Sequence, residues 1–240
     1  MQKSEFDKMR SLVGTHWWFA GRKHLLRVLL GRRIEPDALI LDAGCGTGLA
    51  EEVLSPMGTV IGLDIAAEAV AGRSCESAEQ LCLASVNPSP FRGETFDLVV
   101  ALDIIEHIED DEGAMREFHR ITKPGGRLVV TVPAYEWLRS PHDDALGHYR
   151  RYGAPRLRRL MRDADFRPTR ITYAVAAPLP AAVVFRLVRR LLGGGSGSDM
   201  FEVPGPLNRA LTALMRAEAG LLKHMNLPFG LSVVGVGIRE

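Results

Sequence analysis

A glycine-rich turn follows a short apolar run near residue 40, in the stretch Leu39-Ile40-Leu41-Asp42-Ala43-Gly44-Cys45-Gly46-Thr47-Gly48. Glycine takes a positive φ without strain and has no Cβ, so such a turn brings backbone N–H groups close to a ligand at the N-terminus of the next helix. The spacing is G-x-G-x-G and not the G-x-G-x-x-G of dinucleotide-binding turns. It favours a ligand whose amino-acid end and ribose pass over the turn.

Asp64 lies 20 residues after Gly44, at the end of the next apolar run, residues 59–63. A carboxylate at this position can accept hydrogen bonds from both ribose hydroxyls, as in other nucleotide-binding α/β folds. Asp42, just before the turn, can attract an ammonium group or fix the loop. The alternative is a tight structural turn with a surface aspartate. The agreement of strand, turn and acid argues against that alternative.

Asp103, Glu106 and His107 directly follow another apolar run, residues 96–101. If a helical turn starts there, positions i, i+3 and i+4 share one face. These three side chains are therefore candidate ligands for a divalent metal that lowers the pKa of a substrate oxygen. The alternative is that Glu106 and His107 only order the loop beneath the bound ligand. We do not expect a metal, because one turn supplies at most three ligands and the Asp side chain is short.

A polar segment at residues 141–152 holds several titratable groups. Histidine is suited to take a proton from a hydroxyl group at neutral pH. His148 is the first candidate base and His142 the second, with His107 as a further catalytic candidate. Arg150 and Arg151 are candidates for holding an anionic substrate group. The alternative is that His148, Tyr149 and Arg151 pin this loop to the rest of the protein. The full segment is Pro141-His142-Asp143-Asp144-Ala145-Leu146-Gly147-His148-Tyr149-Arg150-Arg151-Tyr152.

The elements that must position these residues alternate between strand and helix. This alternation is typical of an α/β fold, a doubly wound sheet with helices on both faces. We expect the core to comprise residues 37–177 and 230–240. Expected strands are 39–41, 59–63, 81–83, 96–101, 127–132, 170–175 and 231–238, and expected helices are 49–54, 66–74, 110–121 and 155–164.

Two parts of the chain lie outside this alternation. Residues 1–36 are predicted to form a helical N-terminal extension, whose aromatic cluster at 16–19 either caps the ligand pocket or, as we favour, staples the helix to the core. Residues 178–229 are predicted to form a helical insertion or lid, with two helices joined by a flexible Gly/Ser linker at 193–198. The insertion is apolar and basic together. It is suited to face an apolar substrate, a dimer partner or a membrane surface. The simplest expectation is an ordinary amphipathic helix that packs on the domain.

Composition limits the function classes. The chain has 240 residues, 46% hydrophobic and 25% charged, with a formal net charge of +1, which suits one α/β domain with an insertion and gives no reason to expect nucleic acid. Three cysteines without metal-ligand spacing indicate reduced thiols and a cytoplasmic protein. We expect no leader, because residues 1–10 are polar and carry no apolar core. We expect no transmembrane segment, because Pro178 and Pro180 interrupt the most apolar stretch.

Four segments resemble the motifs of class I S-adenosylmethionine-dependent methyltransferases. Residues 41–48 resemble their motif I, 62–65 the second-strand acidic motif, 95–100 the fourth strand, and 123–128 the turn into the fifth. The resemblance spans about 36–175, and 231–238 resembles the seventh strand. It implies a Rossmann-like seven-stranded sheet with an antiparallel last strand and S-adenosylmethionine as cofactor. The glycines would then lie by its methionine part and Asp64 on its ribose. The candidate cofactor-binding residues are Asp42, Gly44, Cys45, Gly46, Gly48, Asp64, Ile65, Ser85, Val86 and Leu102.

The chain departs from the family at the adenine contact. Many relatives carry an Asp before a Pro-Phe pair after the third strand, whereas this chain has Ser85 and the backbone of Val86 as the best matches. Residues 103–107 resemble the Glu-x-x-Glu-His segment of ubiquinone-type O-methyltransferases, some of which use a metal there. The whole outline resembles bacterial small-molecule methyltransferases associated with glycan or natural-product assembly.

The resemblance implies methyl transfer to a small molecule, apolar or anionic, and most simply to an oxygen atom. A second hypothesis is a protein of the same fold that binds the cofactor and catalyses a non-methylating reaction such as a cyclisation. A nucleic-acid or protein methyltransferase is disfavoured by the net charge. It is also disfavoured because residues 102–105 are Leu-Asp-Ile-Ile and not an amine-methylating Asn/Asp-Pro-Pro-Tyr/Phe motif. A homodimer formed through the insertion is a further expectation.

Overall fold

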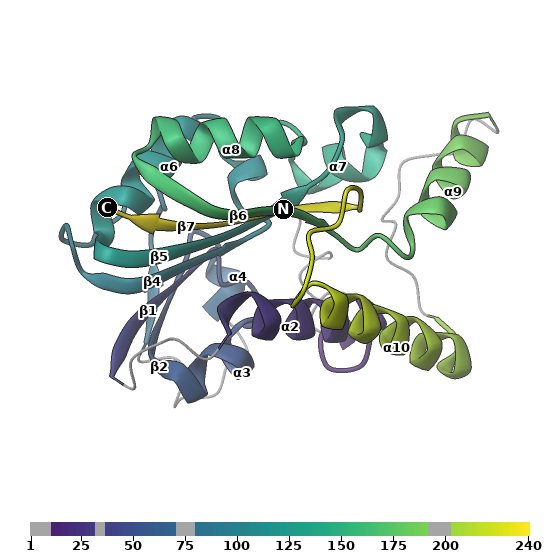
Figure 1. Cartoon of the computed structure of the whole chain (residues 1–240), viewed down its shortest axis with the longest axis horizontal. Coiled ribbons are helices and arrows are strands. Elements are labelled where there is room, and N and C mark those ends of the chain that lie inside the picture. The colour runs from purple at the N-terminus through teal and green to yellow at the C-terminus, as the bar shows by residue number, and fades with distance from the viewer. Residues whose placement is uncertain (1–10, 32–36, 71–79, 192–202) are drawn as a thin grey trace.

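A computed structural model describes residues 11–31, 37–70, 80–191 and 203–240. Its described residues form a seven-stranded sheet in the order β3-β2-β1-β4-β5-β7-β6 (Figure 1). All neighbours are parallel except β7, which pairs antiparallel with both β5 and β6. This confirms the expected Rossmann-like fold. The strands are β1 Ala38–Ala43, β2 Gly58–Asp64, β3 Leu81–Leu83, β4 Phe96–Leu102, β5 Thr122–Pro133, β6 Phe166–Ala174 and β7 Ser232–Arg239.

Helices cover both faces of the sheet. The helices α6 (Asp111–Ile121) and α8 (Ala154–Asp163) lie on one face, and α2 (Trp17–Leu30), α3 (Glu51–Leu54) and α10 (Gly205–Leu221) on the other (Figure 1). Successive side chains of a strand point to opposite faces, so β4 contributes to two cores. Val99 packs in the core beneath α6 and α8, and Val100 in the core against α2, α3 and α10. Burial on both faces explains why β1, β4 and β5 are nearly continuous apolar runs.

The strand order reverses beside β1, which pairs with β2 on one side and β4 on the other. In open α/β sheets, ligands bind at the carboxyl ends of strands where the order reverses. The glycine turn leaves β1 at this point. Asp64 ends β2, and the segment 103–107 follows β4. The fold therefore brings the three strongest sequence signals to one edge of the sheet.

Two strands begin at least four residues earlier than the sequence predicted. β5 begins at Thr122, because Thr122 pairs with Phe96 before the register shifts and Arg127 pairs with Leu98. Between these two pairs β5 has more residues than β4, so the Pro-Gly-Gly segment forms an irregularity in the strand, and Gly125 there has a φ of 76°. β6 begins at Phe166 and likewise contains an irregularity before Arg170. The predicted helix 49–54 is shorter, with α3 over Glu51–Leu54 followed by the 3-10 helix η1 (Ser55–Met57).

The N-terminal helix α2 packs against α10 of the insertion. A Cβ added to Gly21 would lie 2.6 Å from the Met215 side chain, so the two helices approach closely at this glycine. Asn208 accepts a hydrogen bond from the Trp17 amide at 2.8 Å and donates one to the Thr15 carbonyl at 2.9 Å. Trp17 and Trp18 pack against the core on this face, as the stapling alternative expects.

The insertion contains the helices α9 (Leu179–Leu191) and α10. The predicted linker at 193–198 lies outside the described residues, as do residues 1–10, 32–36 and the end of the predicted helix 66–74. The described start of that helix is α4, Ala67–Val70. Among the helices of the described segments, none is long and apolar enough to cross a membrane.

Candidate functional site

The glycine turn has the backbone conformation that its sequence predicts. Gly44, Gly46 and Gly48 have φ values of 71°, 46° and 83°. The amides of Gly44 and Cys45 donate to the Leu63 carbonyl at 2.7 and 3.1 Å, which ties the turn to the end of β2. A Cβ on Gly44 would lie 2.7 Å from Ile104. A side chain at Gly44 is therefore excluded both by its φ and by the loop that follows β4.

Asp64 orders the turn and keeps acceptor capacity for a ligand. Its Oδ2 accepts from the Gly46 amide and its Oδ1 from the Ala66 amide, both at 2.8 Å. Each carboxylate oxygen has two lone pairs, so both oxygens can accept a further hydrogen bond. Ile65, the next residue, is 75% exposed. Its apolar side chain is accessible at the carboxyl edge of the sheet, and Ile65 was predicted from the sequence to contact the cofactor.

The other residues assigned to the cofactor lie in different environments. Asp42 and Cys45 are buried at the start of the turn. The Ser85 hydroxyl accepts from the Asn87 amide at 3.1 Å and donates to the Asn87 carbonyl at 3.0 Å. The Val86 side chain is in the core, which leaves its backbone as the group for an adenine contact. Leu102 is half-buried and packs on the α2 side of the sheet.

Asp103 does not join the predicted set of three metal ligands. Its φ is 52°, so it lies outside the helical turn, which is the 3-10 helix η2 (Ile105–His107). Its carboxylate forms a short contact with the guanidinium of Arg22 on α2 and accepts from the Thr131 hydroxyl at 3.1 Å. Arg22 binds the Asp103 carboxylate, so Asp103 is not in the cluster of candidate ligands that the described residues form, and the metal set Asp103–Glu106–His107 stays a prediction.

Arg22 connects α2 to three strands at the carboxyl edge. Its side chain is 2% exposed. Besides Asp103, the guanidinium donates to the Thr131 hydroxyl at 2.6 Å and to the Ser232 hydroxyl at 3.2 Å. Arg22 could not be predicted from the sequence, because no local pattern links an arginine to an acid 81 positions later.

We expect Arg22→Met to lower the free energy of unfolding by about 2 kcal/mol, because it leaves the partly buried Asp103 carboxylate without its cation. Urea denaturation would measure the change. Adding Asp103→Asn to the variant removes the uncompensated charge and should restore part of the loss. A double variant no more stable than Arg22→Met would contradict this explanation.

His148 replaces Asp103 in the cluster that the structure forms. One ligand atom each from Glu106, His107 and His148 lies within 4.8 Å of the others. The rings of His107 and His148 are nearly perpendicular, with their centroids 4.5 Å apart. The Tyr149 amide donates to the Glu106 carbonyl at 2.8 Å, which joins the loop after β5 to the turn after β4. Two sites that were predicted separately therefore form one.

Asp143 fixes the orientation of His148. Its Oδ1 lies 2.8 Å from His148 Nδ1 and accepts from Arg151 Nε at 2.7 Å. Burial opposes ionisation of Asp143, but the hydrogen bond from His148 and the Arg151 guanidinium outweigh it and lower its pKa. An ionised Asp143 holds the proton of His148 on Nδ1 and leaves Nε2 as the basic nitrogen. Asp143 lies in the polar segment 141–152, but no role was predicted for it from the sequence.

Asp143 is held by its own helix, α7 (Pro141–Leu146). The Ser140 amide donates to Asp143 Oδ2 at 2.8 Å, and the Ser140 side chain completes a capping box. Asp143, the third residue of the helix, is thereby turned inward and is fully buried. A Ser-x-x-Asp pattern before the histidine was the signal from which Asp143 could have been found.

Arg150, Arg151 and His142 do not take the places that the sequence suggested. Arg150 pairs with Asp111 at 2.8 Å and donates to the Glu109 carbonyl at 2.7 Å. Arg151 is buried, and its guanidinium donates to Asp143 and to the Ala134 carbonyl. Both guanidiniums are bound internally, so the predicted anion-binding role is not supported. His142 is half-buried on α7 and is not a member of the cluster formed by Glu106, His107 and His148.

Burial controls the protonation of this cluster. Glu106 is fully buried, and neither of its carboxylate oxygens accepts a hydrogen bond of ordinary geometry from the described residues. Burial and the nearby Asp103 raise its pKa well above the usual range. Burial and the neighbouring His148 lower the pKa of His107 to about 4. Burial thus favours the neutral form of the Glu106 carboxyl, and around neutral pH we expect a neutral His107 imidazole.

The lowered pKa of His107 predicts a stability change on acidification. The unfolded chain takes up a proton on this histidine near its ordinary pKa of 6.5, whereas the folded chain does so only near 4. Its stabilising contribution is thus present above pH 6.5 and falls by about 2 kcal/mol by pH 5. Acidification changes the contribution of Glu106 to the free energy of unfolding in the opposite direction, because the folded chain retains the Glu106 proton above the ordinary Glu pKa.

The effect of His107 alone is measured by comparison with His107→Phe, which keeps an aromatic ring but cannot be protonated. We expect the free energy of unfolding to fall by about 2 kcal/mol more in the wild type than in the variant between pH 7 and pH 5. Equal changes in the two proteins would show that His107 protonates at its ordinary pKa.

Residues 41–130 match the family described as a methyltransferase domain. This segment includes the glycine turn, Asp64 and the residues Glu106 and His107, on the fold described above. The segment 41–130 is therefore similar to a methyltransferase domain. His148 and Asp143 lie beyond the matched segment, so they are assigned from the geometry alone.

A curated protein to which the chain is similar is the ubiquinone biosynthesis O-methyltransferase of Xanthomonas axonopodis pv. citri (strain 306). The identity is 31% over 145 residues, covering 54% of this chain and 61% of that protein. The chain thus matches about three fifths of the length of its curated relative.

Solved structures share the fold at low sequence identity. Geranyl diphosphate methyltransferase, solved in complex with SAM, superposes with a TM-score of 0.59 at 16% identity, covering 92% of this chain and 85% of that one. The [4+2]-cyclase SpnF gives a TM-score of 0.58 at 20% identity, covering 90% and 80%. At these identities the likeness shows the fold alone, because one fold supports more than one reaction.

Proposed function

We propose that this protein transfers a methyl group from S-adenosylmethionine to an oxygen atom of a small molecule. The observation that carries the proposal is the Asp143–His148 pair, which places an oriented imidazole beside Glu106 at the carboxyl edge of the sheet. The turn containing Glu106 follows directly on Ile104, which contacts Gly44 of the glycine turn. A base and a cofactor turn therefore occupy neighbouring loops.

The donor is held by backbone and by one acid in this proposal. The amides around Gly44, Gly46 and Gly48 receive the methionine part, and Asp64 accepts the ribose hydroxyls with its remaining lone pairs. Ile65 packs on the adenine, and Ser85 with the backbone of Val86 contacts its edge. Asp42, Cys45 and Leu102 support the turn and the floor of the site.

His148 acts on the acceptor. Its Nε2 takes the hydroxyl proton while the oxygen attacks the methyl group in line with the departing sulfur, and Asp143 stabilises the imidazolium that forms. The neutral Glu106 carboxyl is a hydrogen-bond donor to the acceptor. The neutral His107 packs edge-on against His148 and limits its rotation. Holding oxygen and methyl carbon in line supplies much of the rate, because the sulfonium is already a reactive donor.

Glu106, His107 and His148 are also the residues that would hold a divalent metal. One carboxylate and two imidazoles form a suitable donor set, and the unpartnered oxygens of Glu106 fit a cation. Such an ion would polarise the acceptor oxygen. We nevertheless propose a metal-independent site, because Arg22 binds Asp103, the further carboxylate of this loop, and burial favours the neutral form of Glu106, which is a poor metal ligand.

We therefore expect turnover to be unchanged after exhaustive treatment with a chelator. Metal analysis of the purified protein by mass spectrometry should find no stoichiometric divalent ion. Activity that is lost on chelation and restored by one added metal would instead assign Glu106, His107 and His148 as ligands.

The acceptor class is tested with methyl-deuterated S-adenosylmethionine and a panel of hydroxyl-bearing small molecules. The proposal predicts a product that gains one deuterated methyl group on oxygen, together with S-adenosylhomocysteine. Conversion of a compound without release of S-adenosylhomocysteine would favour the alternative, a cofactor-binding protein with a non-methylating reaction such as a cyclisation. The panel includes precursors of glycans and natural products, the acceptor classes that we propose.

We also propose that the protein acts in the cytoplasm.

A further inference from the structure

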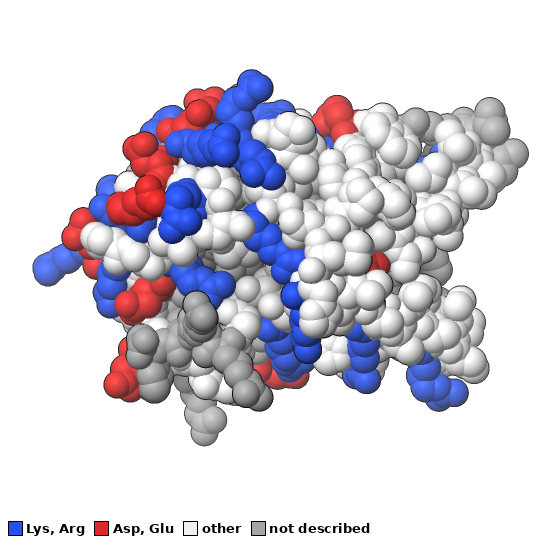
Figure 2. Space-filling model, viewed as in Figure 1, with Lys and Arg blue, Asp and Glu red and all other residues white. Residues whose placement is uncertain are grey.

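Exposed large apolar side chains gather on the insertion. On α9 these are Val184, Phe185, Leu187 and Val188, each at least 43% exposed. On α10 they are Leu207, Leu214 and Leu221, which are 51%, 45% and 54% exposed. The corresponding half of the molecule, on the right of Figure 2, is largely uncharged, whereas charged side chains cover the opposite end. Clustered exposed apolar side chains of this kind mark an interaction site more often than single ones do.

The outer side of α10 has a regular pattern. Leu207, Leu214 and Leu221 are spaced by seven residues and so form a row along the helix, since seven residues make about two turns. Arg209, Arg216 and Lys223 are exposed and follow the same spacing, in a second row. The opposite side of the helix is buried through Met215, Glu218, Ala219 and Leu222. An apolar row and a basic row therefore both border the face that α10 turns away from α2.

Acidic groups are absent from the exposed faces of these two helices. Among the described residues of α9 and α10, Glu218 is the single acid, and it is 8% exposed. Its carboxylate accepts from the amides of Ala176 and Ala177 at 2.8 and 2.9 Å, which ties α10 to the end of β6. The arginines of α10 therefore have no acid of their own helix on the exposed side. The surface is apolar and net positive.

This charge distribution distinguishes between two candidate binding partners for the surface, a second copy of the chain and an anionic lipid bilayer. A second copy of the chain in a twofold dimer would present the same patch, so both copies would bring net positive, acid-free helices into one interface. Like charges held close together oppose association. An anionic lipid surface complements both rows, because the leucines enter the headgroup boundary while the basic side chains contact lipid phosphates.

We propose that the outer faces of α9 and α10 bind the surface of an anionic lipid bilayer, without any part of the described chain crossing it. Both helices project beyond the carboxyl edge of the sheet (Figure 1). Binding in this way would turn the edge that holds the candidate site toward the lipid. The inference rests on exposed side chains of the insertion and does not depend on the proposed methyl transfer.

The test measures co-sedimentation of the full chain with vesicles of phosphatidylcholine and phosphatidylglycerol, and with vesicles of phosphatidylcholine alone. One variant carries Arg209→Gln, Arg216→Gln and Lys223→Gln, and a second carries Leu207→Gln, Leu214→Gln and Leu221→Gln. All six side chains are exposed, so folding should be retained, and circular dichroism checks this.

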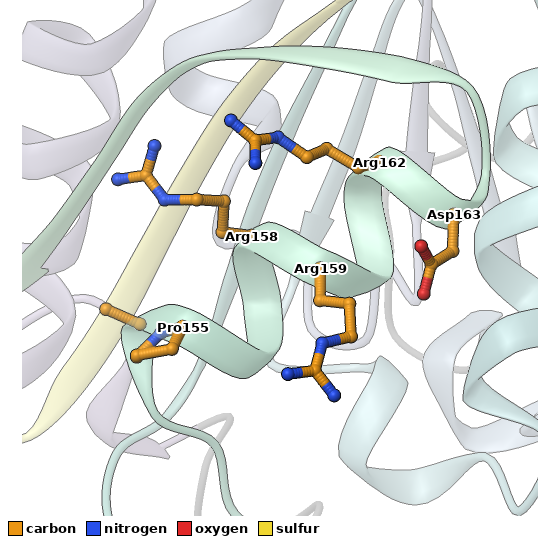
Figure 3. A pocket seen from close by; sticks show the side chains of 6 residues that line it. Pro155, Arg158, Arg159, Arg162 and Asp163 are labelled. Carbon is orange, nitrogen blue, oxygen red and sulfur yellow. The ribbon is translucent and has the colours of Figure 1, made fainter.

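A matched control removes the same number of charges from another face. Arg158, Arg159 and Arg162 are exposed on α8, around a shallow pocket that Ala154, Pro155 and Asp163 also line (Figure 3). Their guanidiniums point outward from α8, on the opposite side of the sheet from α10 (Figures 1 and 3). The triple Arg→Gln variant of α8 thus has the same net charge as the basic-row variant of α10.

We expect the wild type to bind the anionic vesicles and not the neutral ones, with weaker binding at high salt. Removing the basic row should weaken binding by about 100-fold, since each basic side chain near an anionic surface contributes roughly fivefold. Removing the leucine row should weaken it by about 100-fold, since each half-exposed leucine that enters the headgroup boundary contributes roughly fivefold. The α8 control should bind like the wild type.

Three results would overturn the proposal. The first is a wild type that does not sediment with anionic vesicles. The second is an α8 control that loses as much binding as the α10 variant, which would show attraction without a defined surface. The third is a wild-type dimer in size-exclusion chromatography that the leucine variant dissociates, which would assign the surface to a second copy of the chain.

Discussion

Replacing His148 with Gln should lower the turnover number for methyl transfer by about 100- to 10,000-fold, the usual contribution of a positioned general base. Gln retains a polar contact to Asp143 but cannot take the hydroxyl proton. The Michaelis constant for S-adenosylmethionine should stay close to that of the wild type, because His148 lies on the acceptor side. Steady-state kinetics at neutral pH would measure both values.

Asp143→Asn provides the control for this prediction. It keeps the size of the side chain but removes the charge that holds the His148 proton on Nδ1 at 2.8 Å. The two variants should lose turnover in the same direction, and the double variant should lose little more than His148→Gln alone, because both changes affect one unit. Near-normal turnover in His148→Gln would contradict the assignment of the base.

Replacing Asp64 with Ala should weaken binding of S-adenosylhomocysteine by about 100- to 20,000-fold. The change removes two charge-assisted hydrogen bonds to the ribose, each contributing roughly 1.5–3 kcal/mol. It also frees the amides of Gly46 and Ala66, which Asp64 binds at 2.8 Å, so the turn loses its order as well. Isothermal titration calorimetry would measure the dissociation constant.

Asp163→Ala is a matched control for this measurement, because Asp163 is an exposed acid on α8, on the outer face of that helix. The control should bind S-adenosylhomocysteine like the wild type. If Asp64→Ala bound with the wild-type dissociation constant, the ribose contact would be wrong, and the glycine turn would be a structural turn only.

The donor half of the site could be predicted from sequence because its signals are local. Gly44, Gly46 and Gly48 lie within five residues of each other, and Asp64 ends the next strand. A short apolar run that ends in glycines is typical of a buried strand followed by a tight turn, and few other structures fit this pattern. The strand order then follows from the alternation of elements. For this half, the positive φ values of the three glycines and the position of Asp64 at the end of β2 agree with the pattern.

The acceptor half could not be predicted fully because its contacts are long-range. The spacing of Asp103, Glu106 and His107 suggests one helical face, but Asp103 has a positive φ and its carboxylate is bound by Arg22 from α2. His148 takes its place from a loop 42 residues after Glu106. Asp143 and Asp144 look alike in the sequence, and only the capping of α7 at Ser140 decides which one is buried.

The most direct measurement is a crystal structure with S-adenosylhomocysteine bound. The account predicts that the methionine part lies over Gly44–Gly48, that the ribose hydroxyls contact Asp64, and that His148 Nε2 faces the space in front of the sulfur with Asp143 still on Nδ1. A ligand bound elsewhere, or a sulfur that faces away from His148, would contradict the claim that these two halves form one methyl-transfer site.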